Sequence, residues 1–185
     1  ALGLDQNKIH VGIVATLRSW KGHLYLLDAF AQLQRPDLQL VIVGEGPMRE
    51  PITEKIAALG LGDRVTLAGQ RTDPERWLQA MDVFCLPSYA NEGVPQAILQ
   101  AMLCALPIVT TPVGSILEAV SDGETALVVP PKDATALAAA ISRLLDDPAL
   151  AAHLGDHARR VASADFSKDT MLDRMETLFR QARSS

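Results

Sequence analysis

Short hydrophobic runs alternate along the chain with longer stretches in which apolar residues recur every three or four positions. Several of the short runs contain almost no polar residue, which predicts β-strands buried on both faces, as in a parallel sheet. The six predicted strands are Ile9 to Thr16, Leu38 to Val43, Arg64 to Leu67, Val83 to Leu86, Ile108 to Thr110 and Ala126 to Val129.

The stretches with helical spacing lie between these strands and after the last one. Pro148 and the sequence Asp165-Phe166-Ser167 separate the last three helices. We leave open whether the final helix packs on this sheet or on something outside the domain. The apolar faces of the predicted helices lie within Leu24 to Ala31, Ile52 to Leu59, Trp77 to Met81, Ile98 to Leu103, Ala134 to Leu145, Ala149 to Ala162 and Met171 to Ala182.

This alternation predicts an α/β fold: a Rossmann-like, doubly wound parallel sheet of about six strands with a C-terminal helical cap. Parallel neighbours are joined by right-handed crossovers, so the helices cover both faces. The 185 residues suffice for one domain, which we expect to span 1–185.

Composition narrows the class of protein. A formal net charge of −5 argues against a nucleic-acid binder. Only two cysteines are present, Cys85 and Cys104, each in an apolar run, which favours a reducing, cytoplasmic compartment without a disulfide. No apolar stretch approaches the ~20 residues that span a bilayer. The chain starts without Met or a targeting segment, which we interpret as the middle of a longer protein.

The distinctive polar and glycine-rich loops all follow predicted strands. Ligands of open parallel sheets bind beyond the carboxyl ends of the strands, so we expect a site at this edge. The loops follow the first, second, fourth and fifth strands and cover residues 17–22, 44–47, 87–95 and 111–115.

The first two of these loops suit a phosphate ligand. Arg18 and Lys21 stand beside Gly22 at a helix start, where two cations could hold a diphosphate; the alternative is a pair of solvated surface cations. Gly44 and Gly46 would let a ligand approach the backbone, unless they only form a strand-to-helix turn. The third glycine of a dinucleotide fingerprint is missing.

The loop after the fourth strand precedes a helix that we expect to have Pro95 in its first turn. The amides of Gly93 and Val94 would then face an anion at a helix N-terminus. Glu92 could accept hydrogen bonds from sugar hydroxyls, and Gln100 could bond hydroxyls through its amide. The alternative for Glu92 is a first-turn acid that only complements the helix dipole, and the alternative for Gln100 is an exposed residue that only favours the helix.

Taken together, these residues resemble the C-terminal domain of family 4 retaining glycosyltransferases, which have the GT-B fold. The family's pattern is Pro-Ser, Glu-Gly-Phe-Pro, a second Glu eight positions after the first, then Ala-Met, Cys-Gly and a Pro before a valine-rich strand. The matching stretches in this chain are Pro87-Ser88, Glu92-Gly93-Val94-Pro95, Gln100-Ala101-Met102, Cys104-Ala105 and Pro107 to Thr110, with Lys21-Gly22, Gly44 to Pro47, Val113-Gly114, Glu118 and Asp122-Gly123 to Pro130 as further matches.

The resemblance implies a nucleotide-sugar donor as partner, with this chain as one half of a GT-B fold. An N-terminal acceptor domain absent from this chain would complete the enzyme and could attach it to the inner face of the membrane. Lys21 and Arg18 would contact the diphosphate, Gly93 and Val94 the phosphate through their amides, and Glu92 the sugar. Gln100 would bond the ribose, and the residues from Gly69 to Arg71 would lie near the base.

The family uses no metal ion or other cofactor, so we expect none. The four histidines are scattered without ligand spacing, and we expect ordinary surface roles for them. They are His10, His23, His153 and His157.

Three positions depart from the family pattern. Gln100 replaces the second acid and loses the charge-assisted part of a ribose bond, roughly 1 kcal/mol. Thr16 stands where the first loop usually has a basic residue, and Arg18 is two residues later. Ala105 replaces a glycine, which predicts a helix end that needs no left-handed residue.

Three functions remain open at this point. The first is transfer of a hexose, with retention, from a nucleoside diphosphate sugar to a glycan or lipid-linked acceptor in bacterial-type polysaccharide or lipopolysaccharide synthesis; this chain alone would be inactive. The second is a catalytically weakened nucleotide-sugar-binding module. The third is a nucleotide-sugar epimerase of the same fold. The base, the sugar and the acceptor are not specified by the sequence.

Overall fold

The computed structural model describes residues 2–167 together with residues 170, 172, 175, 176, 179 and 180. A six-stranded sheet lies at the centre in the order β3-β2-β1-β4-β5-β6, and every neighbouring pair is parallel. The strands are β1 (Ile9–Val14), β2 (Leu38–Val43), β3 (Val65–Gly69), β4 (Val83–Leu86), β5 (Ile108–Thr110) and β6 (Leu127–Val128).

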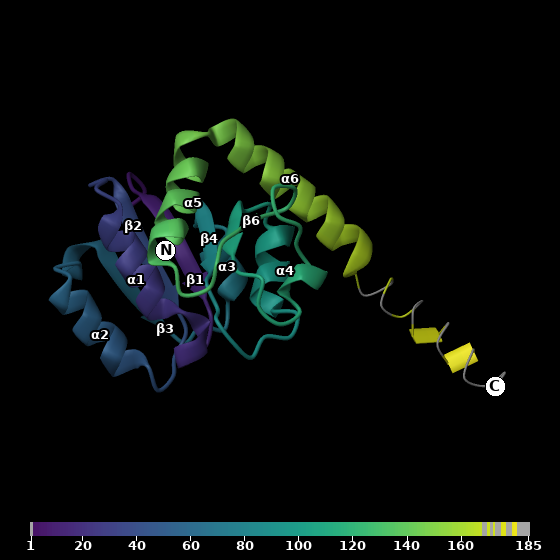
Figure 1. The fold of residues 1–185 in the computed structure, drawn as a ribbon, viewed down its shortest axis with the longest axis horizontal. Coiled ribbons are helices and arrows are strands. Elements are labelled where there is room, and N and C mark those ends of the chain that lie inside the picture. Colours follow the sequence, from purple (N-terminus) through teal and green to yellow (C-terminus); the bar gives the residue numbers. More distant parts are fainter. Residues whose placement is uncertain (1, 168–169, 171, 173–174, 177–178, 181–185) are drawn as a thin grey trace.

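Helices cover the sheet in two groups (Figure 1). In the first group α1 contacts both α2 and α5, and in the second α4 contacts both α3 and α6. The predicted doubly wound α/β fold is therefore confirmed. The helices are α1 (His23–Gln32), α2 (Arg49–Ala58), α3 (Pro74–Leu78), α4 (Gln96–Leu103), α5 (Ala134–Asp146) and α6 (Pro148–Asp165), with short 3-10 helices η1 (Ser19–Lys21), η2 (Gly62–Arg64) and η3 (Ile116–Glu118).

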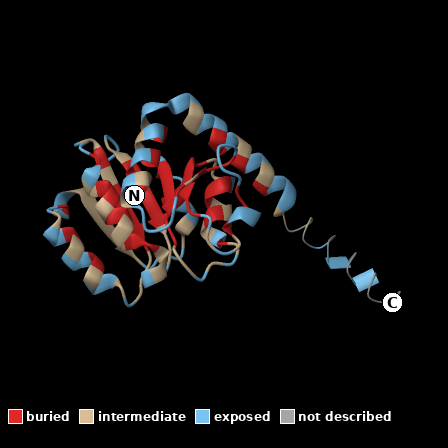
Figure 2. Cartoon of the chain, viewed as in Figure 1, coloured by how far each residue is buried: buried red, intermediate tan, exposed pale blue. Residues whose placement is uncertain are grey.

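The central strands form the most deeply buried part of the molecule, whereas the edge strand β3 is half-buried (Figure 2). All four residues of β4 are buried, and the four central residues of β1 are buried as well. At Gly12 of β1 the Met81 side chain fills the space of a side chain, since a Cβ there would lie 2.3 Å from its sulfur. Burial in a parallel sheet that is covered on both faces therefore explains the near-continuous hydrophobic runs in the sequence.

The ends of the last two helices follow local sequence. The Asp133 carboxylate accepts a hydrogen bond from the Ala136 amide at 2.9 Å, and the Asp147 carboxylate accepts one from the Leu150 amide at the same distance. Both are N-cap contacts, and Pro148 occupies the first turn of α6, where no backbone donor is needed. The helix expected from Met171 to Ala182 lies largely outside the described residues.

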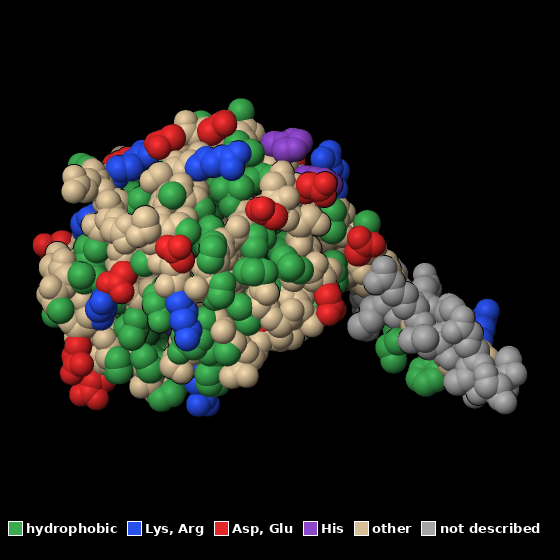
Figure 3. Space-filling view, in the orientation of Figure 1, with side chains coloured by type: hydrophobic (Ala, Val, Ile, Leu, Met, Phe, Trp, Pro, Cys, Tyr) green, Lys and Arg blue, Asp and Glu red, His purple; other side chains and the backbone are tan. Residues whose placement is uncertain are grey.

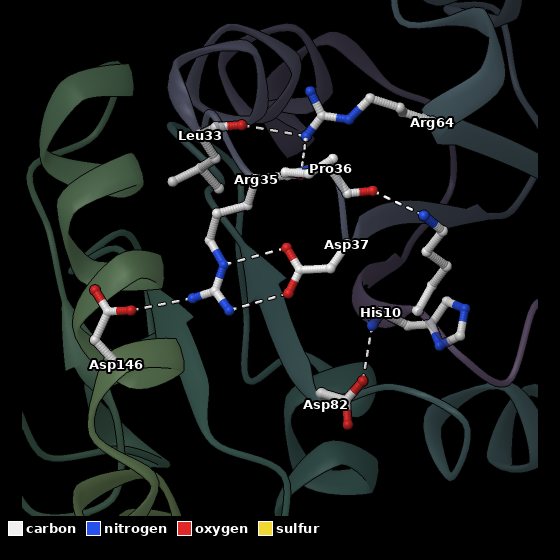
Figure 4. A network of polar contacts seen from close by, with 9 residues as sticks. His10, Leu33, Arg35, Pro36, Asp37, Arg64, Asp82 and Asp146 are labelled. Atoms are coloured by element: carbon white, nitrogen blue, oxygen red, sulfur yellow. Dashed lines mark hydrogen bonds and ion pairs between the residues drawn. The ribbon is translucent and has the colours of Figure 1, made fainter.

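A polar network lies at the amino-terminal edge of the sheet, where strands begin and helices such as α5 end (Figure 4). The Asp82 carboxylate accepts from the His10 amide of β1 at 2.7 Å. Arg35 donates to both carboxylate oxygens of Asp37 and reaches Asp146 of α5 at 3.0 Å. The hydrogen bonds from Arg35 lower the pKa of the Asp37 carboxyl. Because ligands of such sheets bind at the opposite edge, we assign this network to the fold.

The strand boundaries differ slightly from the prediction. β1 ends at Val14 rather than at Thr16, β3 spans Val65–Gly69 rather than Arg64 to Leu67, and β6 is confined to Leu127–Val128. These differences fall at strand ends, where hydrogen-bonded ladders give way to turns and element limits shift by one or two residues.

The prediction for Ala105 was wrong. Its φ is +55°, so the residue after the C-cap of α4 does adopt the left-handed conformation, and an alanine occupies it. The amide of the next residue, Leu106, donates back to the carbonyl of Ala101 at 3.1 Å. The turn therefore has the left-handed geometry in which glycine is usually found, although Ala105 carries a Cβ. Pro95, expected in the first turn of α4, is its N-cap.

Two of the four histidines were also predicted wrongly. His10 and His23 have exposed fractions of 5% and 2%, whereas His153 on α6 is exposed. Both ring nitrogens of His23 and the Nε2 of His10 are buried without a hydrogen-bond partner. His157 places Nδ1 3.0 Å from the carbonyl oxygen of Glu124. A scattered histidine in a sequence gives no signal of burial, because imidazole occurs in both environments.

Candidate functional site

The strand order reverses between β1 and β4, which are neighbours in the sheet although β2 and β3 separate them in the chain. The loops that follow them lead to helices α1 and α4, and we refer to the place where these two loops meet, at the carboxyl edge of the sheet, as the crevice. The predicted site residues of the first and fourth loops lie here. The residues at this crevice that the sequence singled out are Arg18, Lys21, Gly22, Glu92, Gly93 and Val94.

Lys21 and Glu92 form an ion pair across the crevice. The Lys21 ammonium lies 2.7 Å from Oε1 and 2.9 Å from Oε2 of Glu92. The Ser88 hydroxyl donates to Oε1 at 2.6 Å. The Glu92 side chain is 4% exposed and that of Lys21 is 17% exposed, so solvent screens the pair little. A cation and an anion that are 71 residues apart in the sequence are thus fixed against each other.

Two glycines let the loops around this pair touch. Gly22 has φ +79°, and a Cβ there would lie 2.0 Å from the carbonyl oxygen of Pro87. A Cβ at Gly114 would lie 1.9 Å from the carbonyl oxygen of Glu92, which also accepts the Ser115 amide at 3.2 Å. Neither position tolerates a side chain unless the backbone moves. The loops after β1, β4 and β5 are therefore locked together around the ion pair.

The glycines of the second loop have the same function. A Cβ at Gly44 would lie 2.0 Å from the Ala15 carbonyl oxygen, and one at Gly46 would lie 2.7 Å from that of Leu17. These two glycines therefore allow the second loop to pack closely against the first loop. Gly44 also lines a cavity, so its backbone remains accessible there.

This cavity, of about 350 Å³, opens between the ends of the first three strands and the start of α4. Arg71 and Gln100, both predicted as site residues, line it. Arg71 is exposed, and its guanidinium carbon lies 4.8 Å from the centre of the Trp77 ring, within the range of a cation–π contact. The complete lining is Val14, Ala15, Thr16, Val43, Gly44, Glu45, Gln70, Arg71, Pro74, Gln96 and Gln100.

The amides of Gly93 and Val94 make no hydrogen bond within the described part of the chain. They precede α4, an eight-residue helix, and Gly93 is exposed. By contrast, the Gly22 amide donates to the Ser19 carbonyl at 3.2 Å, so it is not available to a ligand. Arg18 is exposed and lies 5.8 Å from the centre of the Trp20 ring.

Two polar contributors were missing from the predicted site. Ser88 bonds Glu92, and Gln96 lines the cavity together with Gln70, which belongs to the stretch from Gly69 to Arg71 that was expected near the base. Gln96 stands four residues before Gln100 on the same helix, a spacing that places both on one face, so the sequence contained a signal for it. The contact of Ser88 depends on how its loop folds, for which periodicity gives no signal.

On the face shown in Figure 3, Lys and Arg side chains are interspersed with Asp and Glu. Both cysteines are free, Cys85 buried in β4 and Cys104 partly buried. Within the described residues, no helix combines the length and apolar character needed to cross a membrane.

The profile of the family described as glycosyl transferases group 1 matches residues 1–161. The chain is 34% identical over 186 aligned residues to an alpha-D-kanosaminyltransferase from Streptomyces kanamyceticus, covering 97% of this chain and 47% of that protein. It is 35% identical to the lipopolysaccharide core biosynthesis mannosyltransferase LpsB from Rhizobium meliloti, covering 82% and 46%. The chain therefore spans about half the length of these relatives.

Solved structures also match nearly the whole chain. Anabaena Alr3699/HepE in complex with UDP and glucose matches with a TM-score of 0.89 and 28% identity, covering 94% of this chain and 48% of that one. Sucrose-phosphate synthase from Thermosynechococcus elongatus matches with a TM-score of 0.88 and 34% identity, covering 99% and 47%. The expectation of a GT-B glycosyltransferase domain is confirmed, while the narrower placement in family 4 stays a prediction. The chain belongs to the glycosyl transferases group 1 family.

Proposed function

We propose that this chain is the donor-binding half of a retaining hexosyltransferase that uses a nucleoside diphosphate sugar and acts on a glycan or lipid-linked acceptor. The observation that carries the proposal is the Lys21–Glu92 pair beside the free amides of Gly93 and Val94, at the reversal of strand order. The names of the relatives support it: one is a kanosaminyltransferase, another a mannosyltransferase of lipopolysaccharide core synthesis, and a structural neighbour was solved with UDP and glucose.

In this reaction the bond between the anomeric carbon and the diphosphate oxygen breaks, and the diphosphate departs with the electron pair. The acceptor hydroxyl gives its proton to an oxygen of the departing diphosphate and forms the new bond on the same face of the sugar. Lys21 and the amides before α4 stabilise the charge that develops on the departing group, since they are preorganised and need not reorient. Arg18, exposed at the same loop, adds a second cation to the diphosphate.

Glu92 has two functions in this proposal. It fixes the Lys21 ammonium, which has three donor protons and can contact a phosphate oxygen while the ion pair persists. Its Oε1 already accepts from Ser88 and Lys21, whereas Oε2 accepts from Lys21 alone and retains a free lone pair. That lone pair can accept from a sugar hydroxyl. The carboxylate thus orients the cation and the sugar at once.

The nucleoside occupies the cavity of about 350 Å³. Gln100 bonds the ribose hydroxyls, and the planar guanidinium of Arg71, which lies over the Trp77 ring, can stack on the base. Gly44 contributes accessible backbone at the end of β2. No metal ion or other cofactor has a function in this scheme, because cationic side chains and amides neutralise the diphosphate.

Calorimetric titration of the chain with UDP, GDP and ADP, each with and without its sugar, tests the donor site. We expect at least one of them to bind, and Lys21→Met to weaken that binding about 10- to 100-fold, the loss of one charge-assisted hydrogen bond. Lys8→Met is the matched control, since the Lys8 ammonium donates to the Pro36 carbonyl at the opposite edge. Absence of binding with every nucleotide, or equal effects of the two variants, would refute the donor-site assignment.

A second candidate, a catalytically weakened binding module, is favoured by Gln100 and Thr16. The carboxamide of Gln100 lacks the charge of the usual acid, and Thr16 in the cavity wall has no positive charge. Turnover in the longer protein separates the two candidates: a module would bind the donor without transferring its sugar. The relatives do not favour the epimerase alternative. We place the reaction in the cytoplasm, with any peripheral membrane attachment through an acceptor-binding half.

A further inference from the structure

A second cavity, of about 270 Å³, lies beside η1. Its volume is just below the range of pockets that hold drug-sized ligands, so it accommodates a single small ring rather than a nucleotide. Its walls come from η1, the first turns of α1, α2 with its N-cap, and the loop after β4. The lining is Ser19, Leu24, Tyr25, Asp28, Met48, Lys55 and Tyr89.

One wall carries an ion pair. The Lys55 ammonium of α2 lies 2.6 Å from Oδ1 of Asp28 on α1, and the two side chains are 33% and 37% exposed. A pair this exposed contributes little to stability, so the fold does not require it. Oδ2 of Asp28 and the remaining ammonium protons stay available, and together they can accept from one hydroxyl and donate to its neighbour.

Another wall is aromatic. Tyr25 and Tyr89 pack edge to face, with ring centres 5.9 Å apart and planes at 85°. Tyr89 is held in place, since its amide donates to the Trp20 carbonyl at 2.8 Å and the Lys132 ammonium lies 4.7 Å from the centre of its ring. The two tyrosines therefore present a rigid surface with apolar faces and polar tips.

These walls match the chemistry of a sugar ring, which has an apolar C–H face and an edge of adjacent hydroxyls. A phosphate fits less well, because Asp28 neutralises Lys55 and would repel an anion. We propose that this cavity is a saccharide-binding subsite, separate from the donor site, that takes one neutral pyranose ring against Tyr25 and Tyr89 with its hydroxyls on Asp28 and Lys55.

The subsite shares its structural frame with the donor crevice. Ser19 begins the three-residue turn that Lys21 ends, and Tyr89 lies three residues before Glu92 in the same loop. A sugar held there lies next to the loops that would bind the diphosphate. The identification of this ring as part of the glycan on which the enzyme acts rests on the proposed function. The proposal that the cavity binds a sugar rests on the cavity alone.

Titration of the chain without nucleotide tests this site, with methyl α-D-mannopyranoside, methyl α-D-glucopyranoside and maltotriose as probes and NMR or calorimetry as the readout. We expect saturable binding in the millimolar range by at least one probe, unaffected by saturating UDP. Asp28→Asn keeps the shape of the cavity and should weaken binding at least about fivefold, the loss of a charge-assisted hydrogen bond. Asp63→Asn, an exposed acid of η2, is the matched control and should have no effect.

Three results would overturn the proposal: no saturation by any probe up to about 50 mM, well beyond a millimolar dissociation constant; equal binding by the wild type and Asp28→Asn; or displacement of the sugar by UDP, which would place it in the donor crevice. Nucleotide titrations of the same samples decide the proposed function independently. Asp28→Asn should leave them unchanged because Asp28 lies outside the donor cavity.

Discussion

The buried His23 makes the stability of this domain depend on pH in a defined window. The residue begins α1, directly after Gly22, and is 2% exposed with neither ring nitrogen bonded. Its pKa is lowered from 6.5 to about 4, chiefly by burial and to a smaller extent by the nearby Lys21 charge, while the Arg18 backbone opposes the change. The unfolded chain therefore binds a proton between these two values that the folded domain does not.

The sign and size follow from proton linkage. A lowered pKa for a base means that the unfolded state takes up more protons, so stability falls as the pH decreases from about 6.5 to about 4. With these two pKa values, the loss is about 2 kcal/mol at pH 5 and about 3 kcal/mol at pH 4. Above pH 7 the residue stays neutral in both states and contributes no slope.

Urea unfolding of the wild type and of His23→Leu, at several pH values between about 4 and 7, isolates this residue from the titrating carboxylates. The difference in free energy of unfolding between the two proteins should change by about 3 kcal/mol across the window, in favour of the variant at low pH. His153→Leu, at an exposed position of α6, is the control and should run parallel to the wild type. A difference that stays constant with pH would show that His23 is not buried as a neutral ring.

Three further substitutions test local geometry and the site. Ala105→Gly should raise stability by about 0.5–1 kcal/mol, because it relieves a left-handed alanine, whereas Ala57→Gly, at an exposed position in the last turn of α2, should lower it by about 0.5 kcal/mol; thermal and urea unfolding measure both. Gly155→Ala should destabilise by about 1–3 kcal/mol despite better helix propensity, since its Cβ would lie 2.1 Å from the Ala105 carbonyl oxygen; a rise in melting temperature would contradict this. Gln100→Glu should tighten nucleotide binding about fivefold in calorimetry if Gln100 bonds the ribose, and unchanged affinity would remove it from the site.

The fold could be predicted from the sequence because its signals are local and repeated. Leu38–Val43 and Val83–Leu86 are uninterrupted or nearly uninterrupted apolar runs, and a parallel sheet buried on both faces is the structure that accommodates them. Asp147 followed by Pro148 marks a helix start through capping and a fixed φ. In each case the residues that determine the element are adjacent in the chain.

The predictions that failed concern properties set by distant parts of the chain. Ala105 was expected to avoid the left-handed region because alanine usually does, but its turn closes against Gly155 of α6, fifty positions later. His23 was expected at the surface, although its burial depends on packing around α1. Propensity describes the average environment of a residue type, and tertiary contacts decide the individual one.

The candidate site could be predicted only in part from the sequence, and the reason is its glycines. A sequence with Gly22 and Gly114 indicates tight turns, but it does not say what fills the space where a Cβ would be. In the structure that space holds the carbonyl oxygens of Pro87 and Glu92, so each glycine brings one loop into contact with the loop after β4. The Lys21–Glu92 pair is a consequence of this packing. A side chain at either glycine should therefore separate the charged groups without removing either of them, so the geometry of the proposed donor site depends on residues that have no side chain to contact the ligand.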